Sequence, residues 1–369
     1  MNTFKLKIKT NNQSYNLFVG NNLIKDLLKI FKNNKITFEK CLLVIDKKVP
    51  KKYVKKINFL LRKKIKHNYI FNPTEINKSQ KTVNKLLNIL LKNNFHRNDL
   101  LISIGGGIVG DVCAFVGSIF KRGMKFVNIP TTLLAQVDSS LGGKSSINSE
   151  KYGKNLIGSF YQPHLVISDT LFLKSLPKRE IICGYAEILK HSLIKSKKFF
   201  TYLDKNTNNI LSLKKPFIEK AIIQSCLIKK GIVEKDEKEK NVRKLLNFGH
   251  TFAHAFEATN KFSKKLNHGE AVLLGMICAL NFSYKKKYIN SNDLKKIKDH
   301  YKKINLPRNL KNYYSIKNIK KIISFMKKDK KNYSTKINLV LLKKIGLANY
   351  NYSFDEKNIY RFFKEELIN

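Results

Sequence analysis

The chain has 369 residues, 43% of them hydrophobic, which is enough for two domains with substantial cores. Its formal charge of +47 comes from 73 lysines and arginines against 26 aspartates and glutamates, and only seven of the 73 are arginine. The basic residues are spread along the chain, whereas nucleic-acid surfaces usually cluster arginine with aromatic residues, so we expect an anionic small molecule and no nucleic acid as partner.

The first half of the chain alternates strand-like and helix-like segments. Residues 4–19 contain two stretches with alternating apolar and polar side chains, and residues 41–46 form a short buried strand. Apolar positions at helical spacing predict a helix over 79–95. A second buried strand over 99–107 precedes a mostly apolar helix, and the next strand stops at Pro130. This order predicts a mainly parallel sheet with helices on both faces.

The pattern changes near Pro177 into one helix after another, separated by charged stretches such as residues 233–241. We therefore predict a Rossmann-like α/β domain over residues 1–176, followed by an all-α domain over residues 177–369.

The cysteines and apolar runs favour a soluble protein of the cytoplasm. The five cysteines are scattered and form no C-x-x-C pair, which is typical of buried thiols in a reducing compartment. The N-terminal residues contain no long apolar stretch, so no secretory signal is expected. The longest apolar run, residues 271–280, is too short to cross a bilayer, and we expect no membrane partner.

The segment "ISIGGGIVGD" (102–111) places Gly105, Gly107 and Gly110 in G-x-G-x-x-G spacing between a strand and a helix. Such glycines permit a tight turn and close approach to a pyrophosphate, whose charge suits the helix N-terminus. The pattern predicts a dinucleotide or phosphate site, with a plain strand-to-helix turn as the alternative. Asp46 ends an earlier strand, and a carboxylate there would bind ribose hydroxyls and favour NAD over NADP, unless it is a plain loop acid.

Residues 130–163 are rich in glycine, serine, threonine and lysine. Lys144 and Lys154 each follow a glycine, so that an ammonium group and nearby amides can close around an anion. Asp138 lies in the same segment and could hold a ligand hydroxyl or orient a lysine. A solvated loop is the alternative interpretation.

The segment "LLNFGHTFAHAFE" (245–257) contains most of a predicted helix, residues 248–258, with a polar and an apolar face. The polar face has His250, His254 and Glu257, and the apolar face has Phe248, Phe252 and Phe256. The Glu of H-E-x-x-H is missing, which excludes a zinc-protease helix.

An acid from elsewhere would complete a metal site with these histidines. Glu187 in "GYAEILKH" supplies one, with Lys190 on the same helical face. Two imidazoles and one carboxylate leave a coordination position open for substrate, as a catalytic zinc site requires. A proton relay and a packed core remain alternatives.

Several motifs together resemble the 3-dehydroquinate synthase family. They stand in the family's order at near-family spacing over roughly residues 70–335. The resemblance implies that the α/β domain, residues 1–176, binds NAD and that the helical domain, residues 177–369, binds metal and substrate. It also implies a homodimer. The motifs are "GGGIVGD", "RGMKFVNIPTTLLAQVDSSLGGK", "GKNLIGSFYQP", "LPKRE", "GYAEILKH", "LLNFGHTFAHAFE" and "HGEAV".

The resemblance also implies the residues of the site. It assigns Zn²⁺ or Co²⁺ to Glu187, His250 and His268, and it makes His254 a nearby polar group and not a ligand. The implied NAD contacts are Glu75, Lys78, Gly107, Ile108, Val109, Gly110, Asp111, Thr131, Thr132, Lys144, Lys154, Phe172, Leu173, Lys174 and Ser175, beside Asp46 from the reasoning above. The implied substrate and phosphate contacts are Arg122, Asp138, Lys144, Lys154, Asn155, Lys190, Lys229, Arg243, Asn247, His254, Lys330 and Lys331.

One segment departs from the family pattern. Where the family commonly has D-G-E-x-x-K, this chain has "PTEINKS" (73–79), so Glu75 and Lys78 match but Pro73 and Thr74 do not. Because the segment contacts the adenosine side of NAD in the family, we expect an altered affinity for the cofactor.

The family converts 3-deoxy-D-arabino-heptulosonate 7-phosphate to 3-dehydroquinate and phosphate in the shikimate pathway, which leads to chorismate and the aromatic amino acids. The resemblance implies oxidation of a ring carbinol by NAD⁺, elimination of phosphate, return of the hydride, ring opening and aldol closure. The alternatives are another sugar phosphate cyclase, a metal-dependent polyol dehydrogenase of the same fold, and a basic nucleic-acid-binding protein.

Overall fold

The computed structural model describes residues 3–11, 13–263, 265–328 and 336–368. The chain forms two compact units, the first comprising residues 1–181 with 229–238 and the second comprising residues 182–228 with 239–369. The assignment of NAD binding to residues 1–176 and of metal binding to residues 177–369 stays a prediction.

Seven strands form the central sheet of the first unit. They are β1 (Phe4–Lys9), β2 (Ser14–Gly20), β3 (Lys40–Asp46), β4 (Ile65–Phe71), β5 (Leu100–Gly105), β6 (Lys125–Pro130) and β9 (Leu165–Asp169). Their order is β1-β2-β9-β6-β5-β3-β4. All neighbours run parallel except β1, which pairs antiparallel with β2 at one edge. The predicted mainly parallel sheet is therefore confirmed.

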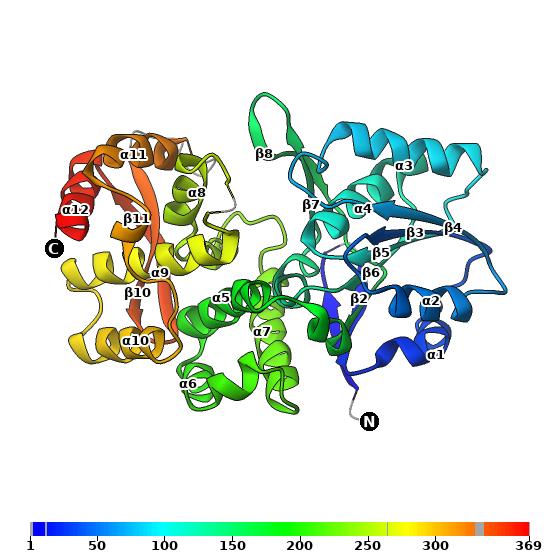
Figure 1. Ribbon diagram of the computed structural model, residues 1–369, viewed down its shortest axis with the longest axis horizontal. Helices are drawn as coiled ribbons and strands as arrows, with labels where there is room; N and C mark the ends of the chain where they lie inside the picture. The colour runs from blue at the N-terminus through cyan, green and yellow to red at the C-terminus, as the bar shows by residue number, and fades with distance from the viewer. Residues whose placement is uncertain (1–2, 12, 264, 329–335, 369) are drawn as a thin grey trace. The chain divides into compact units, whose positions relative to one another are not determined.

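Four helices cover the two faces of this sheet (Figure 1). They are α1 (Leu27–Asn33), α2 (Lys51–Leu60), α3 (Gln80–Lys92) and α4 (Gly107–Ile119). Successive strand side chains point to opposite faces, so Leu43 and Ile45 pack with α1 and α2, whereas Leu42 and Val44 pack with α3 and α4. Because both faces are buried, β3 and β5 read in the sequence as nearly continuous apolar runs.

Two further strands, β7 (Lys144–Ser149) and β8 (Gly153–Phe160), form an antiparallel ribbon within residues 130–163, for which the sequence predicts no strand. Its glycines, serines and lysines carry a weak strand signal. Ile147 anchors β7 in the core beside α3 and α4, whereas β8 is largely exposed. Just before the ribbon, Ala135–Ser139 form a turn of π-helix, a conformation that is frequent at functional sites.

The second unit is mainly helical, as predicted, and α9 (His268–Lys285) is buried along most of its length. α8 (His250–Thr259) packs against α9 at a glycine contact, because a β-carbon on Gly275 would lie 2.2 Å from the carbonyl oxygen of Gly249. Gly249 itself has a φ of +79°, which favours glycine. The other helices are α5 (Lys178–Lys195), α6 (Lys197–Leu211), α7 (Phe217–Val233), α10 (Ser291–Lys303), α11 (Ile319–Lys327) and α12 (Glu356–Ile368), of which α5 and α7 have parts in both units.

The second unit also contains an antiparallel ribbon of β10 (Ile337–Lys344) and β11 (Leu347–Phe354). The prediction that this domain contains only helices is therefore wrong at these residues. A short apolar run such as "INLVLL" cannot be distinguished from a buried helix by periodicity, which explains the omission. The backbone N–H of Leu342 donates a hydrogen bond to Ser283 Oγ on α9 at 3.1 Å, so the ribbon packs along that helix (Figure 1).

The burial of the cysteines agrees with an expectation from the sequence. All five cysteines are buried as thiols, and burial raises the pKa of Cys41 to about 12, which makes it unreactive. Among the residues that the structure describes, no helix has both the length and the apolar character needed to span a bilayer.

His300 joins three helices of the second unit and gives the fold a dependence on pH. Its Nδ1 lies 2.8 Å from Asp204 Oδ1 on α6, and its Nε2 lies 2.9 Å from the Tyr185 hydroxyl on α5. Burial lowers the pKa of His300 below its usual value of 6.5, although Asp204 partly opposes this effect. The unfolded chain therefore binds this proton more readily than the folded one.

We predict that the contribution of neutral His300 to stability is present above about pH 6.5 and is lost as the pH falls through its lowered folded pKa. The variant His300→Gln should be about 1–3 kcal/mol less stable at pH 7.5, but it should lose less stability than the parent between pH 7.5 and pH 5. Urea unfolding followed by circular dichroism at several pH values measures both effects, with His96→Gln as a control for loss of an exposed histidine. Equal pH dependence in parent and His300→Gln would contradict the prediction.

Candidate active site

The glycine turn links β5 to α4 at the carboxyl end of the sheet. A β-carbon on Gly105 would lie 2.5 Å from the Val109 side chain and 3.1 Å from Cβ of Asp46, so the turn needs glycine and lies beside the end of β3. The chain passes from β3 outward to β4 and then returns to β5 on the other side of β3. Such a reversal in strand order marks the crevice where open α/β sheets bind dinucleotides.

Asp46 has the position expected of a ribose contact at this crevice. Its side chain is buried and accepts a hydrogen bond from the backbone N–H of Lys48 at 2.8 Å. Burial raises the pKa of Asp46, while Lys48 and Lys47 oppose the shift. Asp46 thus lies beside the glycine turn, and its role toward NAD stays a prediction.

A buried lysine connects the N-terminal half of α4 to the β7–β8 ribbon. Lys78 Nζ lies 2.6 Å from Asp111 Oδ2 on α4 and 2.5 Å from Asn155 Oδ1 on β8. Burial raises the pKa of Asp111, and Lys78 opposes that shift. Three residues that the family resemblance assigns to NAD or substrate thus form one polar network.

Glu75 extends this network along the ribbon. Its carboxylate pairs with Lys154 at 2.9 Å and accepts a hydrogen bond from Asn148 Nδ2 at 2.8 Å. Burial by itself raises the pKa of Glu75, but Lys154, Asn148 and Lys78 together outweigh burial and leave the pKa lowered. Glu75 is therefore held in its charged form beside two lysines.

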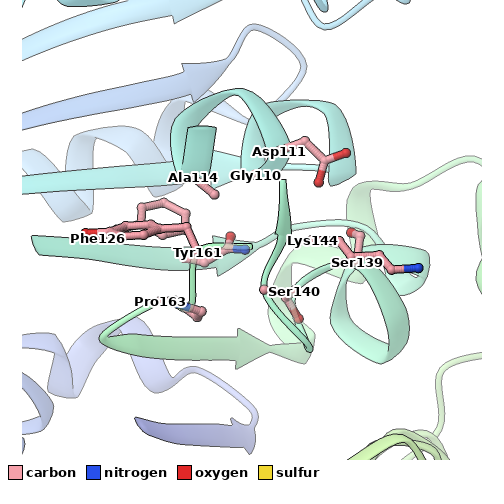
Figure 2. A pocket seen from close by; sticks show the side chains of 11 residues that line it. Gly110, Asp111, Ala114, Phe126, Ser139, Ser140, Lys144, Tyr161 and Pro163 are labelled. Atoms are coloured by element: carbon pink, nitrogen blue, oxygen red, sulfur yellow. The ribbon is translucent and has the colours of Figure 1, made fainter. Parts of the chain in front are cut away.

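Figure 2 shows a small pocket beside the N-terminal half of α4. Asp111 and Lys144 approach it from α4 and from the start of β7, while Phe126 and Tyr161 form its apolar side. Ser140 Oγ is buried and has no hydrogen-bond partner among the described residues, so a polar ligand atom or a water molecule would satisfy it. The other lining residues are Gly110, Ala114, Asn128, Ser139, Gly143 and Pro163.

Asp138 and Lys229 form a second buried ion pair in the first unit. Lys229 Nζ lies 2.5 Å from Asp138 Oδ1 and 2.6 Å from the Asp138 carbonyl oxygen. Asp138 lies in the π-helical turn, whereas Lys229 comes from the end of α7. The structure thus brings together two predicted substrate contacts that are 91 residues apart.

The remaining predicted residues of the first unit divide into three groups. Thr131, Val109, Phe172 and Leu173 are buried. Ile108, Thr132, Lys174 and Ser175 are at least partly accessible. Arg122 follows α4 and lies roughly 20 Å from the glycine turn by helix rise.

In the second unit, the three predicted metal ligands lie together. One ligand atom each of Glu187, His250 and His268 lie within 4.8 Å of one another. Glu187 comes from α5, while His250 and His268 are the first residues of α8 and α9. His250 Nε2 lies 3.5 Å from Glu187 Oε1.

The surroundings of Glu187 fit a divalent cation. Its side chain is buried, and neither oxygen accepts a hydrogen bond of normal geometry from the described residues, although the Lys190 ammonium lies against Oε2. A buried carboxylate without such bonds is costly. One carboxylate and two imidazoles are a common donor set for catalytic zinc, with a position left for substrate.

The two histidines predicted as ligands are each contacted at Nδ1. His250 Nδ1 lies 3.2 Å from the carbonyl oxygen of Phe248, and His268 Nδ1 lies 3.2 Å from Glu257 Oε2. Burial lowers the pKa of His268, but Glu257 and Glu187 outweigh burial and raise it overall. Glu257 thus has a specific partner on the polar side of α8.

Of the other predicted substrate contacts in the second unit, His254 lies beside this cluster. His254 is exposed, and its ring centroid lies 5.5 Å from that of His250 and 6.4 Å from that of His268. Arg243 is buried just before α8, and Asn247 Nδ2 donates a hydrogen bond to Glu239 at 2.5 Å. Lys330 and Lys331 lie outside the described residues.

Comparisons with known proteins agree on one family. Family models described as 3-dehydroquinate synthase N-terminal and C-terminal match residues 68–183 and 184–332. The chain is 59% identical over 367 residues to 3-dehydroquinate synthase of Pelagibacter ubique (strain HTCC1062), and all of both chains is covered. It is 39% identical to the enzyme of Alkaliphilus metalliredigens (strain QYMF), which covers 91% of this chain and 92% of the relative.

The chain belongs to the 3-dehydroquinate synthase family. Among solved structures it is similar to 2-deoxy-scyllo-inosose synthase complexed with carbaglucose-6-phosphate, NAD⁺ and Co²⁺, with a TM-score of 0.84, 25% identity, and 98% and 100% of the two chains covered. The fold is shared with 2-epi-5-epi-valiolone synthase from Streptomyces hygroscopicus subsp. jinggangensis 5008, with a TM-score of 0.85 at 22% identity over 97% of this chain and 98% of that chain.

Glu239 is a candidate site residue that the sequence analysis missed in this member of the family. It bonds Asn247 and lies four residues before Arg243, but it belongs to the acidic and basic stretch 233–241, which was interpreted only as a break between helices. The signal available in the sequence was an acid four residues before Arg243, which was itself a candidate.

The segment that departs from the family pattern keeps its matching residues in place by a local turn. Thr74 Oγ1 accepts a hydrogen bond from the backbone N–H of Asn77 at 3.2 Å, and the Thr74 carbonyl accepts one from Lys78 N–H at 3.0 Å. The threonine thus supports a turn that directs Glu75 and Lys78 to the ribbon. The expected effect on NAD affinity stays a prediction.

We predict that Lys78→Met lowers the free energy of unfolding by about 1–3 kcal/mol, because it removes the ammonium partner from the carboxylate of Asp111. Chemical denaturation measures this loss. Lys81→Met, at an exposed position of α3, is the matched control and should change stability by less than about 0.5 kcal/mol. Equal stability of the two variants would show that the network does not support the fold.

Proposed function

We propose that this protein converts 3-deoxy-D-arabino-heptulosonate 7-phosphate to 3-dehydroquinate and phosphate in the shikimate pathway, as a phosphate-eliminating lyase. The observation that carries the proposal is the meeting of Glu187, His250 and His268 in a chain whose full length matches a 3-dehydroquinate synthase. We further propose that it acts as a homodimer in the cytoplasm.

The groups at the glycine turn suit NAD, and the cluster of Glu187, His250 and His268 suits a divalent metal. The related structures with this fold were solved with NAD⁺ and with Co²⁺ or Zn²⁺. When bound, NAD⁺ accepts and returns a hydride, and the metal polarises substrate oxygens as a Lewis acid. The amides at the start of α4 suit a pyrophosphate, and Asp46 suits the ribose hydroxyls. Glu187, His250 and His268 would hold the metal.

The positive side chains have a different task, which is to hold the two anionic ends of the substrate. Arg243 is buried, and its planar guanidinium suits bidentate contact with phosphate or carboxylate. Lys190 is buried against Glu187 and provides a second positive charge at the cluster. A simple polyol dehydrogenase has no phosphate to bind and would not need these groups.

His254 and Asn247 suit the handling of protons and hydroxyls. The exposed imidazole of His254 lies beside both histidine ligands, so it can hold a substrate hydroxyl or a water molecule. Asn247 is oriented by its hydrogen bond to Glu239 and presents the rest of its amide for a similar contact. The departing phosphate itself can accept the proton that the elimination releases.

We predict phosphate release from the heptulosonate phosphate when NAD⁺ is present in catalytic amount together with Zn²⁺ or Co²⁺. Because the hydride is returned in each turnover, no net NADH should accumulate. A phosphate assay and absorbance at the NADH band measure both quantities. Stoichiometric NADH without phosphate would indicate a polyol dehydrogenase, and phosphate release only from another sugar phosphate would indicate a different cyclase.

We predict that His250→Ala loses metal and turnover together, because it removes one of three protein ligands. Zinc content after dialysis should fall well below one ion per chain, and phosphate release should drop at least about 100-fold. His96→Ala, at an exposed histidine of the first unit, is the control. Full metal content with full activity in His250→Ala would refute the ligand assignment.

A further inference from the structure

Different groups contact the rings of the two histidine ligands, His250 and His268. The Nδ1 atom of His250 faces a backbone carbonyl oxygen, that of Phe248, at 3.2 Å. The Nδ1 atom of His268 faces a side-chain carboxylate, that of Glu257, at 3.2 Å. Each oxygen can only accept, so each Nδ1 carries the proton and each Nε2 is left with its lone pair.

For His250 this arrangement points the lone pair toward the ligand cluster. Its Nε2 is the atom that lies 3.5 Å from Glu187 Oε1. The ring of His268 lies close by, with its centroid 5.7 Å from that of His250. The same tautomer in both rings would present two Nε2 lone pairs to one ion.

We propose that Glu257 is a positioning residue for His268, which holds the proton on Nδ1 and turns Nε2 toward Glu187 and His250. Histidines that bind metals commonly donate their other N–H to a carboxylate or carbonyl, and these partners raise metal affinity. The proposal rests on the proposed function, because it takes His268 to be a metal ligand.

The burial of Glu257 supports a specific role. The residue is only 9% exposed, although it lies on the polar side of α8. A carboxylate at such a position is costly unless a partner compensates it, and His268 is a partner of suitable geometry. α8 thus provides both a ligand, His250, and the group that orients another ligand.

The backbone position of His268 is fixed separately from its ring. α9 begins with a capping box in which Asn267 and Glu270 bond each other's backbone N–H groups. This cap sets where the helix starts, through hydrogen bonds that do not involve Glu257. Replacing Glu257 therefore changes the ring orientation and tautomer while the helix start is kept.

The first test is the affinity of the full-length protein for Zn²⁺, measured by competition with a chromogenic chelator. Glu257→Leu removes the acceptor and should weaken Zn²⁺ binding about 10- to 100-fold, whereas Glu257→Gln keeps an amide oxygen as acceptor and should lose less. Thr259→Val, a buried near-isosteric change on the same helix, is the matched control and should bind as the parent does. Parental affinity in Glu257→Leu, with its fold verified by circular dichroism, would overturn the proposal.

The second test is independent of metal and reads the tautomer directly. Long-range ¹H–¹⁵N spectra of metal-free protein labelled at histidine, recorded near pH 8, distinguish protonation at Nδ1 from protonation at Nε2. The His268 signals are assigned by their loss in His268→Gln. We expect Nδ1–H in the parent and in Glu257→Gln, and a shift toward Nε2–H in Glu257→Leu.

The two tests separate failure of this proposal from failure of the proposed function. Nε2–H at His268 in the parent would overturn the positioning role whatever the protein catalyses. Failure of the parent to bind Zn²⁺ or Co²⁺ would refute the metal site of the proposed function, while the tautomer would still report on Glu257.

Discussion

The buried carboxylate of Glu187 is the group around which the site in the second unit is arranged, because its negative charge must be balanced by nearby groups. Removal of such a charge from water costs several kcal/mol unless positive groups or hydrogen bonds replace the lost hydration. Lys190 lies on the next turn of α5, and the imidazoles of His250 and His268 approach from two other helices. The packing of the helices is consistent with this need. The close contact between Gly249 and Gly275 sets α8 against α9, and the first residues of both helices, His250 and His268, lie near the Glu187 carboxylate.

In the first unit the buried charges that need compensation are positive. There, lysines are buried and acids compensate them, in the pairs Lys78–Asp111 and Lys229–Asp138. Both pairs join segments that are distant in sequence, and both involve residues next to the glycine turn or to the π-helical turn. The sheet provides the rigid support, because its two buried faces leave only the strand ends available for polar groups.

Periodicity explains which parts of the fold could be predicted from the sequence. Buried parallel strands and amphipathic helices carry strong local patterns, so β3, β5, α3 and α8 were expected close to where they lie. The ribbons β7–β8 and β10–β11 carry weak patterns, because polar and small residues fill the first and a short apolar run fills the second.

The site was predictable where a motif or a helical face carried the signal, and not where a tertiary contact decided the role. The face of α8 with His250 and Glu257 followed from spacing, but the pairing of Glu257 with His268 depends on how two helices meet. Glu187 was proposed as the completing acid from its place in an apolar helix, but the choice of His268 over His254 as a ligand followed only from the resemblance to the family. Glu239 was missed because charge runs look alike until one acid is seen to bond Asn247.

The large excess of basic over acidic residues affects which side chains are informative in this sequence. With 73 basic residues and only 26 acids, positive side chains form the background, and an acid inside an apolar helix stands out against it. Glu187 in "GYAEILKH" and Glu257 in "HAFEAT" are of this kind, and both lie at the cluster of histidines. In lysine-rich proteins, where basic patches carry little information, the rare anionic positions are therefore the better guide to where chemistry takes place.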